Sequence, residues 1–508
     1  MSKYYITTPI YYANDRPHIG HAYTTIAADV LARYHRLKGD DVWFLTGTDE
    51  HGAKVAASAA KAHQEPKAFV DEQAKRYQDA WKHLNISSDD FIRTTDPRHK
   101  TGAQKLLLTL KQAKALYKDK YEGLYCTGCE KFMTEKDLVD GKCPDHKRKP
   151  EMIAEENWFF KLREYLPQVK ELIEKDEIKI LPESKKNEAL GLIKQGVDDF
   201  SVSRQKVEWG IPVPFDKQQT IYVWVEALSN YLTALDQEHN GEKFQKFWPA
   251  DMQLMAKDIL KFHAIYWPAL LLAAGEEPPK AIFAHGFFTI NKEKMSKTVG
   301  NVIDSNTLVQ KFGADGTRYL LLSQFPFGID GDIKEERFVE KYNAELANNL
   351  GNLVSRVIKM THKFHAGKVP QIAKPVKELP LQSSQFIEFD EPYMWKQFNR
   401  CLGDEFEPFE CLNSIWRFIN SLNSYVDKNE PWKLAKEGED EALAEVMADL
   451  LNSLYQLSFT LYPFLPETAT LIKQAVSGKG FTTEKESETD LPAGQEVKDI
   501  EMLFPRIG

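Results

Sequence analysis

The N-terminal segment 4–21 constrains the fold of this chain more than any other part of the sequence. It begins with a run of aromatic and β-branched residues at 4–8, which predicts a buried strand. Pro9 and the polar cluster 13–17 end the run. An amphipathic helix follows, and Gly39 is placed to end it in a left-handed conformation. Strand, turn and helix in this order indicate an open α/β sheet.

Two histidines and a glycine lie at the predicted start of this helix. His18 and His21 are three residues apart and share a face, while Gly20 leaves room for a ligand to approach the backbone. The N-terminus of a helix attracts anions through its unpaired N–H groups, by about 0.3–1 kcal/mol. The segment lacks the glycine-rich P-loop motif. Taken alone, such a histidine pair is more often a feature of an ordinary helix surface.

A second buried strand is predicted at 41–46, and Asp49 follows it closely. Ligands of parallel α/β sheets bind at the carboxyl ends of the strands, so the Asp49 carboxylate is placed to hold an ammonium group. The local sequence is equally consistent with a turn whose side chains cap the next helix.

Cysteines and a histidine occur as a C-x₂-C-x₁₃-C-x₂-H pattern, formed by Cys126, Cys129, Cys143 and His146. Four such ligands in two knuckles predict a closed, structural Zn²⁺ site with no open position for catalysis. The alternative is a set of reduced, metal-free thiols. A loop as polar as this one has little apolar surface to bury and would be poorly ordered without metal.

Farther along, a strand-like run at 281–290 leads into a lysine-rich loop that contains Lys294, Ser296 and Lys297. Two lysines on one loop suit the β- and γ-phosphates of ATP, although most lysine-rich loops are merely solvated. From about residue 341 the apolar spacing is helical throughout, which predicts an antiparallel bundle. The stretch 477–494 is rich in Gly, Ser, Thr and Glu and predicts a flexible connector, and 500–505 is expected to dock onto the body.

Size and composition set the broad class. The chain has 508 residues, enough for several domains, and a net charge of −9, so an RNA partner would have to bind local basic patches. No apolar run approaches the roughly 18–20 residues of a membrane helix. With five cysteines, three of them near one histidine, and no signal-peptide pattern at the start, we expect a cytoplasmic protein without membrane contact.

The pairing of Pro-His-Ile-Gly-His at 17–21 with Lys-Met-Ser-Lys at 294–297 resembles the signature pair of class I aminoacyl-tRNA synthetases. Within that class, three features resemble the methionyl-tRNA synthetase family. They are the segment 8–14, the inserted single zinc knuckle, and the helix 343–356 together with Asn429-Glu-Pro-Trp432. Related enzymes for leucine, isoleucine and valine carry a large editing insertion, for which this chain is too short. The enzyme for cysteine grips its substrate with zinc, whereas here all four ligands are protein.

The resemblance implies an α/β fold, namely a doubly wound parallel Rossmann-type sheet with an inserted zinc-knuckle connective domain, followed by an all-α bundle. The expected segments are 1–116 and 219–290 for the two halves of the sheet domain, 117–218 for the insertion, 291–342 for the lysine-loop and stem-contact region, 343–476 for the anticodon-binding bundle and 477–508 for a connector and docking tail.

The resemblance also implies site residues. His18, Gly20, His21, Lys294, Ser296 and Lys297 would bind ATP, with the histidines and lysines catalytic, and Asp49 would bind the ammonium group of methionine. Aromatic side chains suit a thioether, each contact contributing roughly 0.3–1.5 kcal/mol. The rest of the methionine pocket would be Ile10, Tyr12, Trp224, Ala227, Tyr231, Ile259, Phe262 and His263, with Leu228 where some members have proline.

The implied reaction joins methionine to tRNA(Met) through methionyl-adenylate, with Mg²⁺ entering on ATP. Asn352, Arg356 and Trp432 would read the anticodon. Relatives that dimerise use an added C-terminal domain, so we expect a monomer. Two alternatives stay open: a small-molecule nucleotidyltransferase, which would need no helical bundle, and a non-catalytic RNA-binding protein with a zinc knuckle, which would need neither histidines nor lysines.

Overall fold

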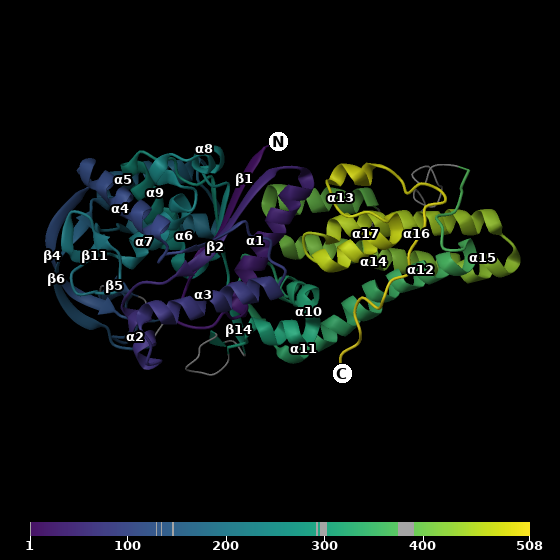
Figure 1. Ribbon diagram of the computed structural model, residues 1–508, viewed down its shortest axis with the longest axis horizontal. Coiled ribbons are helices and arrows are strands. Elements are labelled where there is room, and N and C mark those ends of the chain that lie inside the picture. The colour runs from purple at the N-terminus through teal and green to yellow at the C-terminus, as the bar shows by residue number, and fades with distance from the viewer. Residues whose placement is uncertain are drawn as a thin grey trace.

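The computed structural model describes residues 2–128, 130–133, 135–144, 147–290, 293–294, 302–373 and 391–508, with only the backbone given at 136, 293 and 294. The molecule is elongated (Figure 1). A lobe built on β-sheets lies at one end and a helical lobe at the other, joined through the region of α10 (Ser305–Leu322) and α11 (Glu335–Lys341). In the part of the chain described here, no helix is both long and apolar enough to cross a bilayer.

A six-stranded, fully parallel sheet forms the centre of the first lobe, in the order β3-β2-β1-β12-β13-β7. The chain runs outward in one direction from β1 to β3 and in the other from β12 to β13, so the topological switch lies between β1 and β12. The strands are β1 Lys3–Tyr12, β2 Asp41–Asp49, β3 Asp90–Arg93, β7 Lys179–Leu181, β12 Met252–Ala256 and β13 Ala281–His285.

Successive strand residues bury on opposite faces of this sheet. Ile6 of β1 packs with α1 (Ile19–Lys38) and α10 (Ser305–Leu322), whereas its neighbour Tyr5 packs with α4, α7 and α9. Helices on both faces make the sheet doubly wound, as predicted. Gly39 caps α1 with φ +89, the left-handed conformation expected from the sequence. The other helices of this lobe are α2 Ala53–Lys61, α3 Pro66–His83, α4 Pro97–Gln112, α5 Leu162–Glu174, α6 Glu183–Gln195, α7 Val223–Thr233, α8 Glu242–Phe247 and α9 Trp267–Ala274.

Two small antiparallel sheets carry the insertion. One is β5-β4-β6-β8, formed by β4 Leu116–Cys126, β5 Lys131–Met133, β6 Glu151–Phe160 and β8 Phe200–Ser201. The other is β10-β11-β9, formed by β9 Ser203–Arg204, β10 Pro212–Val213 and β11 Asp216–Ile221.

The structure differs from the predicted boundaries of the insertion in two places. β7 lies inside 117–218 but pairs with β13 as an edge strand of the central sheet. β11 was expected to begin the second half of the sheet domain, yet it belongs to an antiparallel sheet. A three-residue strand gives almost no periodicity to read, and strand character alone does not say which sheet a strand joins.

A buried charge network joins α1, α10 and the second lobe. Arg318 of α10 is fully buried, forms an ion pair with Asp29 of α1 at 2.7 Å, and donates to the carbonyls of Phe464 at 2.7 Å and Pro463 at 2.8 Å. Asp29 also pairs with Arg33 at 2.7 Å. A buried charge is stable only when paired and hydrogen-bonded, so these contacts hold the two lobes in one arrangement.

The second lobe is the predicted antiparallel bundle. After α11 (Glu335–Lys341), a π-helical segment, η5 Tyr342–Gly351, continues into α12 Asn352–His365. The bundle is completed by α13 Glu391–Asn399, η7 Arg400–Glu405, α14 Pro408–Asn429, α15 Pro431–Glu437, α16 Asp440–Leu461 and α17 Pro466–Ser477. Its apolar core is continuous with the α1 face of the sheet.

The C-terminal segment packs more closely than the composition suggests. Leu491 is buried, its N–H donates to Asn452 Oδ1 at 2.7 Å, and Gln456 Nε2 donates to the Ser487 carbonyl at 2.6 Å. A few apolar anchors thus order a stretch that was expected to be a flexible connector. The docking expected at 500–505 is observed, since Phe504 is buried against Tyr342.

Candidate active site

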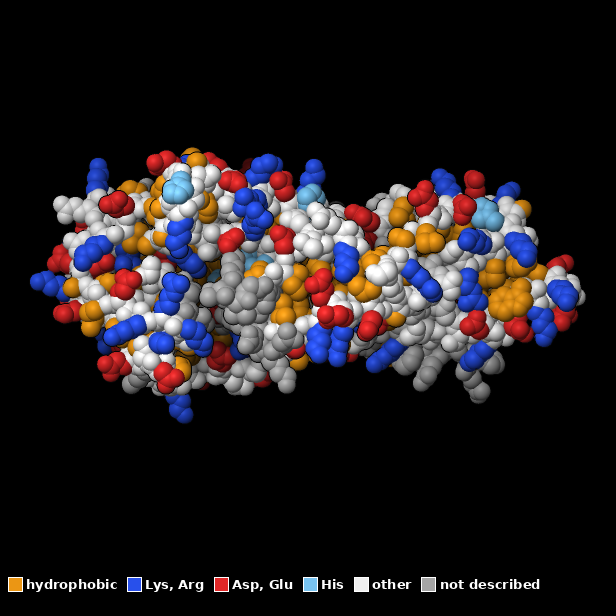
Figure 2. Space-filling view, turned by 90° about the horizontal axis from the view of Figure 1, so that it is seen from below, with side chains coloured by type: hydrophobic (Ala, Val, Ile, Leu, Met, Phe, Trp, Pro, Cys, Tyr) orange, Lys and Arg blue, Asp and Glu red, His pale blue; other side chains and the backbone are white. Residues whose placement is uncertain are grey.

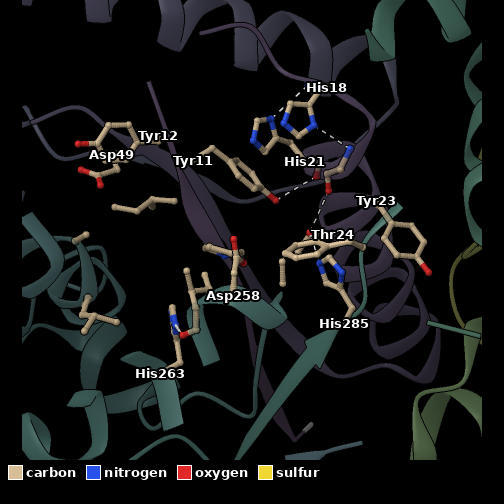
Figure 3. A pocket seen from close by; sticks show the side chains of 18 of the residues that line it. Tyr11, Tyr12, His18, His21, Tyr23, Thr24, Asp49, Asp258, His263 and His285 are labelled. Carbon is tan, nitrogen blue, oxygen red and sulfur yellow. Dashed lines mark hydrogen bonds between the residues drawn. The ribbon is translucent and has the colours of Figure 1, made fainter. Parts of the chain in front are cut away.

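A cavity of about 330 Å³ opens at the carboxyl ends of β1, β2, β12 and β13, beside the topological switch. Figure 3 shows His18 and His21 on one side of Tyr11, with Tyr12 and Asp49 on the other. We call these two parts the histidine end and, after the residues predicted to bind methionine, the methionine end. Eleven of the predicted residues line this cavity: Ile10, Tyr12, His18, Gly20, His21, Asp49, Trp224, Ala227, Tyr231, Ile259 and His263.

The two histidines cap their own helix. His18 is the N-cap of α1, and its Nδ1 accepts the N–H of Gly20 at 3.1 Å. The His18 N–H in turn donates to His21 Nδ1 at 3.3 Å, and the two rings stack with centroids 3.7 Å apart. This reciprocal arrangement is a capping box made of imidazoles. It fixes both rings before any ligand binds.

Burial decides the protonation of these rings. It lowers the pKa of His18 to about 4 and holds the pKa of His21 well below its usual value, with the neighbouring His18 adding to the effect on His21. Both are therefore neutral near pH 7. Because each Nδ1 accepts a backbone N–H, the single ring proton lies on Nε2. The histidine end thus offers two neutral Nε2–H donors beside the N-terminus of a helix.

The lysine segment is described only at its two ends, and both reach the histidine end. Phe288 of β14 (Phe288–Ile290) lines the cavity, and β14 pairs with β15 (Glu293–Lys294) and β16 (Gly331–Ile333). On the far side, Asp304 forms a β-bridge with His18. Lys294 lies on β15 with its backbone alone described, and the predicted Ser296 and Lys297 lie outside the described residues.

At the methionine end, Asp49 is the last residue of β2 and is buried. Among the described groups none donates to its Oδ1, although this atom is buried in the cavity wall. Burial first, and then the nearby carboxylates of Glu226, Glu130 and Glu50, raise the pKa of Asp49 well above its usual value. A buried acceptor without a partner, in a field of negative charge, suits a cationic ligand group.

Aromatic rings form the wall of the methionine end. Trp224 stacks on Phe262 with centroids 3.9 Å apart, and Phe262, the one predicted pocket residue not in the lining, lies behind it. The Tyr231 hydroxyl donates to His263 Nε2 at 2.7 Å, because His263 Nδ1–H donates to the Ile259 carbonyl at 3.0 Å. The wall residues 262–266 form a π-helical turn, a distortion frequent at functional sites.

Sequence reasoning missed part of the lining. His285 ends β13, and its Nε2 lies 2.6 Å from the Thr24 hydroxyl of α1. Its position at the carboxyl end of a predicted strand, the rule that selected Asp49, would have identified it. The other lining residues that were not predicted as part of the site are Pro9, Tyr11, Tyr23, Asn230, Ala256, Asp258, Gly286, Phe287 and Phe288.

Two of the four predicted zinc ligands are described. Cys126 ends β4 and Cys143 is fully buried, and both pack in a small cluster with Met133. Cys129 and His146 lie outside the described residues. Two buried cysteines in so small a cluster are consistent with thiolate ligands of zinc.

The predicted anticodon residues lie at the far end of the bundle. Arg356 and Trp432 line a groove of about 330 Å³ between α12 and α15, together with Lys359, Met360, Lys363 and Phe364. Arg356 pairs with Asp427 at 2.7 Å and lies 5.9 Å from the centre of the Trp432 ring. Asn352 precedes Arg356 by one helical turn. Figure 2 shows apolar side chains at this end with basic ones around them.

Comparison with known proteins agrees with this arrangement. Residues 4–149 and 136–358 match the family described as tRNA synthetases class I (M), and 409–508 match the anticodon binding domain of methionyl tRNA ligase. The chain is 45% identical to the methionine–tRNA ligase of Clostridium perfringens, over 99% of this chain and 78% of that protein. It is 41% identical to the methionine–tRNA ligase of Bacillus subtilis, over 100% of this chain and 78% of that protein.

Solved structures give the same result. The methionyl-tRNA synthetase of Mycobacterium tuberculosis in complex with methionyl-adenylate superposes with a TM-score of 0.95 at 35% identity, covering 100% of both chains. The free form of that enzyme gives a TM-score of 0.87, at 32% identity over 100% of this chain and 99% of that one. The chain therefore belongs to the methionyl-tRNA synthetase family of class I aminoacyl-tRNA synthetases, the methionine–tRNA ligases.

Proposed function

We propose that this methionine–tRNA ligase divides its cavity between two substrates, with the triphosphate of ATP at the histidine end and methionine at the other. The observation that carries the proposal is that a single cavity joins the N-terminus of α1 to an aromatic wall and to the buried carboxylate of Asp49, whose Oδ1 accepts no hydrogen bond from the described residues. Bound this way, the methionine carboxylate attacks the α-phosphate, and pyrophosphate leaves on the side of the lysine segment.

In this arrangement His18 and His21 donate Nε2–H to the α-phosphate and its bridging oxygen, and Gly20 gives the triphosphate access to the backbone. Lys294, Ser296 and Lys297 bind the β- and γ-phosphates. Mg²⁺ arrives with ATP and neutralises phosphate charge. Catalysis rests on positioning and on charge stabilisation, because no covalent bond to the protein is needed.

Methionine is held by Asp49, whose carboxylate accepts the α-ammonium group. The thioether lies against the aromatic wall formed by Tyr12, Trp224, Tyr231 and Phe262, and contacts of sulfur with aromatic rings favour it over a branched aliphatic chain. Ile10, Ala227, Ile259 and His263 complete the walls. The neutral state of His263, whose pKa burial lowers to about 4, keeps a second positive charge away from the ammonium group.

The groove on α12 and α15 receives the anticodon of tRNA(Met). Trp432 is 43% exposed and offers a face on which an unpaired base stacks, while Arg356 and Asn352 read base edges. A terminal ribose hydroxyl of the same tRNA then attacks the adenylate carbonyl and releases AMP. We propose that the enzyme acts as a monomer in the cytoplasm.

Cys126, Cys129, Cys143 and His146 would hold one structural Zn²⁺, which orders the insertion and supplies no chemistry. The buried thiols of Cys126 and Cys143 support this assignment. Metal analysis of the purified protein should find about one zinc per chain, and Cys126→Ser should remove it.

An ATP–pyrophosphate exchange assay across the twenty amino acids tests the proposal. We expect exchange with methionine alone, without tRNA, followed by charging of tRNA(Met) and no other tRNA. Exchange driven equally by leucine or isoleucine would contradict the assignment of the aromatic wall. Exchange without charging would contradict the assignment of the groove.

A further inference from the structure

Glu130 belongs to the insertion, yet its side chain lies against the methionine end of the cavity. It stands between the predicted zinc ligand Cys129 and strand β5, and it is 3% exposed. Its backbone carbonyl accepts a hydrogen bond from the hydroxyl of Tyr222, the N-cap residue of α7. A carboxylate buried this deeply requires partners. Among the described residues, the Arg204 guanidinium of the insertion supplies a nearby positive charge, and the two closest polar contacts come from the central sheet domain.

The first partner is the start of α2. Gly52 is the N-cap of that helix and has no side chain to cap it. Glu130 Oε1 accepts the N–H of Lys54, the second residue of α2, at 2.6 Å. This is the hydrogen bond that an N-cap side chain normally makes, supplied here from another domain. It holds the helix that begins four residues after Asp49.

The second partner is Tyr12, which ends β1 and lines the cavity. A methyl group built on Gly52 would lie 2.5 Å from Glu130 Oε2 and 2.6 Å from the Tyr12 hydroxyl, so these two oxygens meet above the same glycine. The Tyr12 hydroxyl donates to the His51 carbonyl at 3.2 Å, so the Glu130 carboxylate lies beside a hydroxyl that the backbone after Asp49 also holds. The φ of +101 at Gly52 and this crowding together exclude any larger residue there.

We propose that Glu130 is a positioning residue for methionine. It fixes the Tyr12 ring and the backbone that follows Asp49, and it connects the zinc knuckle to the amino-acid pocket. This inference rests on the proposed division of the cavity, since it assigns the Tyr12 and Asp49 end to methionine. At the histidine end, His18 and His21 cap their own helix and have no contact with Glu130 among the described residues. Substitution of Glu130 should therefore weaken methionine binding and leave ATP binding unchanged.

Three substitutions test the inference. Glu130→Gln keeps the length and one acceptor oxygen. Glu130→Asp keeps the charge but shortens the side chain by one methylene. Glu130→Ala removes the acceptor oxygens and the charge. We expect the alanine variant to raise the KM for methionine about tenfold, because displacement of a binding residue by about 1 Å is costly. The glutamine variant should remain within about twofold of wild type, and aspartate should fall between. The KM for ATP and kcat should change less than twofold in all three.

The exposed Glu135, on the same insertion, provides the matched control as Glu135→Ala. Calorimetry with methionine and no ATP gives a readout besides activity, and zinc content verifies that the knuckle is intact. Equal rises in both KM values, or no rise for Glu130→Ala, would overturn the proposal. If Glu130→Ala does not fold, the aspartate variant decides, because it must still raise the KM for methionine alone.

Removal of zinc provides a second test of the proposal. Stripping the wild-type enzyme with a chelator should weaken methionine binding in calorimetry, whereas Glu130→Ala should lose little more on stripping, because its connection to the pocket is already broken. Equal losses in the two proteins would contradict the connection. Failure of the wild type to bind methionine at all would instead contradict the proposed function.

Discussion

The cavity in the sheet and the groove on the bundle are built in opposite ways. In the cavity, buried and half-buried polar side chains pair with each other, as His18 does with His21 and Tyr231 with His263. In the groove, Trp432 is 43% exposed, and Arg356 is held at the surface by an ion pair. Group transfer requires reacting atoms fixed within a fraction of an ångström, whereas stacking on a base tolerates displacement. The two constructions match the two tasks that we propose for them.

The largest effect should follow from His18→Ala. Loss of an Nε2–H donor aimed at developing phosphate charge should lower methionine-dependent ATP–pyrophosphate exchange about 1,000-fold. The affinity for tRNA, measured by filter binding, should not change. His63→Asn is the matched control, because His63 is exposed and its φ of 54 is one that asparagine tolerates. Exchange within tenfold of wild type would remove His18 from the site.

Asp49→Asn should come next. The amide has the same size but lacks the charge that pairs with an ammonium group, a loss of about 1.5–3 kcal/mol, so kcat/KM for methionine should fall about 10–150-fold. The KM for ATP should stay within twofold. Asp79→Asn, at an exposed helix position, is the control. A rise in the KM for ATP equal to that for methionine would contradict the separation of the two ends.

Trp432→Ala tests the assignment of the groove to the anticodon. Stacking of an unpaired base contributes about 1–3 kcal/mol, so kcat/KM for charging of tRNA(Met) should fall about 5–150-fold while exchange is unaffected. Met502→Ala removes a more exposed apolar side chain elsewhere, 76% exposed, and should affect neither reaction. Equal losses in exchange and charging would show that the two sites are not separate modules.

The smallest effect is on acid stability. Burial lowers the pKa of His285 to about 4. Near pH 7.5 this histidine is neutral in both folded and unfolded chains; below about pH 6.5 the unfolded chain takes up the proton first, so stability is lost as the pH falls toward 4. Between pH 7.5 and 5.5 this amounts to about 1 kcal/mol. His285→Gln should remove that loss.

Urea midpoints at the two pH values measure this effect, with His362→Gln on the exposed face of α12 as the control. The midpoint of His285→Gln should shift less with pH than that of wild type. Parallel shifts in all three proteins would show that His285 does not titrate on unfolding.

Much of the fold could be predicted because it depends on local sequence patterns. The strand at the N-terminus, the helix after it with its stop at Gly39, and the bundle all follow from periodicity and turn chemistry. Asp49 and the histidines were identified because they stand at strand ends and helix starts, and the aromatic wall was identified through the family resemblance.

The remaining features of the fold and the site depend on contacts between residues that are far apart in sequence, which no local pattern predicts. Thr24 and His285 are 261 residues apart in sequence and form one hydrogen bond. Glu130 caps a helix 76 residues earlier, in place of the missing side chain of Gly52. The tail after 477 is polar in composition, and contacts with the bundle order it, such as those of Leu491 with Asn452 and of Ser487 with Gln456. Each of these depends on a partner supplied by tertiary structure.

The buried pair of Asp29 and Arg318 has a consequence for the RNA. Separation of the lobes would take the carbonyls of Phe464 and Pro463 away from the buried Arg318 guanidinium, at about 1.5–3 kcal/mol for each hydrogen bond to a charged group, so the junction resists opening. With methionine and the anticodon bound as proposed, the distance between the two sites is then set by the protein. In chimaeras that exchange bundles between relatives, the carbonyls of Pro463 and Phe464 should therefore stay within reach of Arg318. Otherwise the arrangement of the two lobes will be lost.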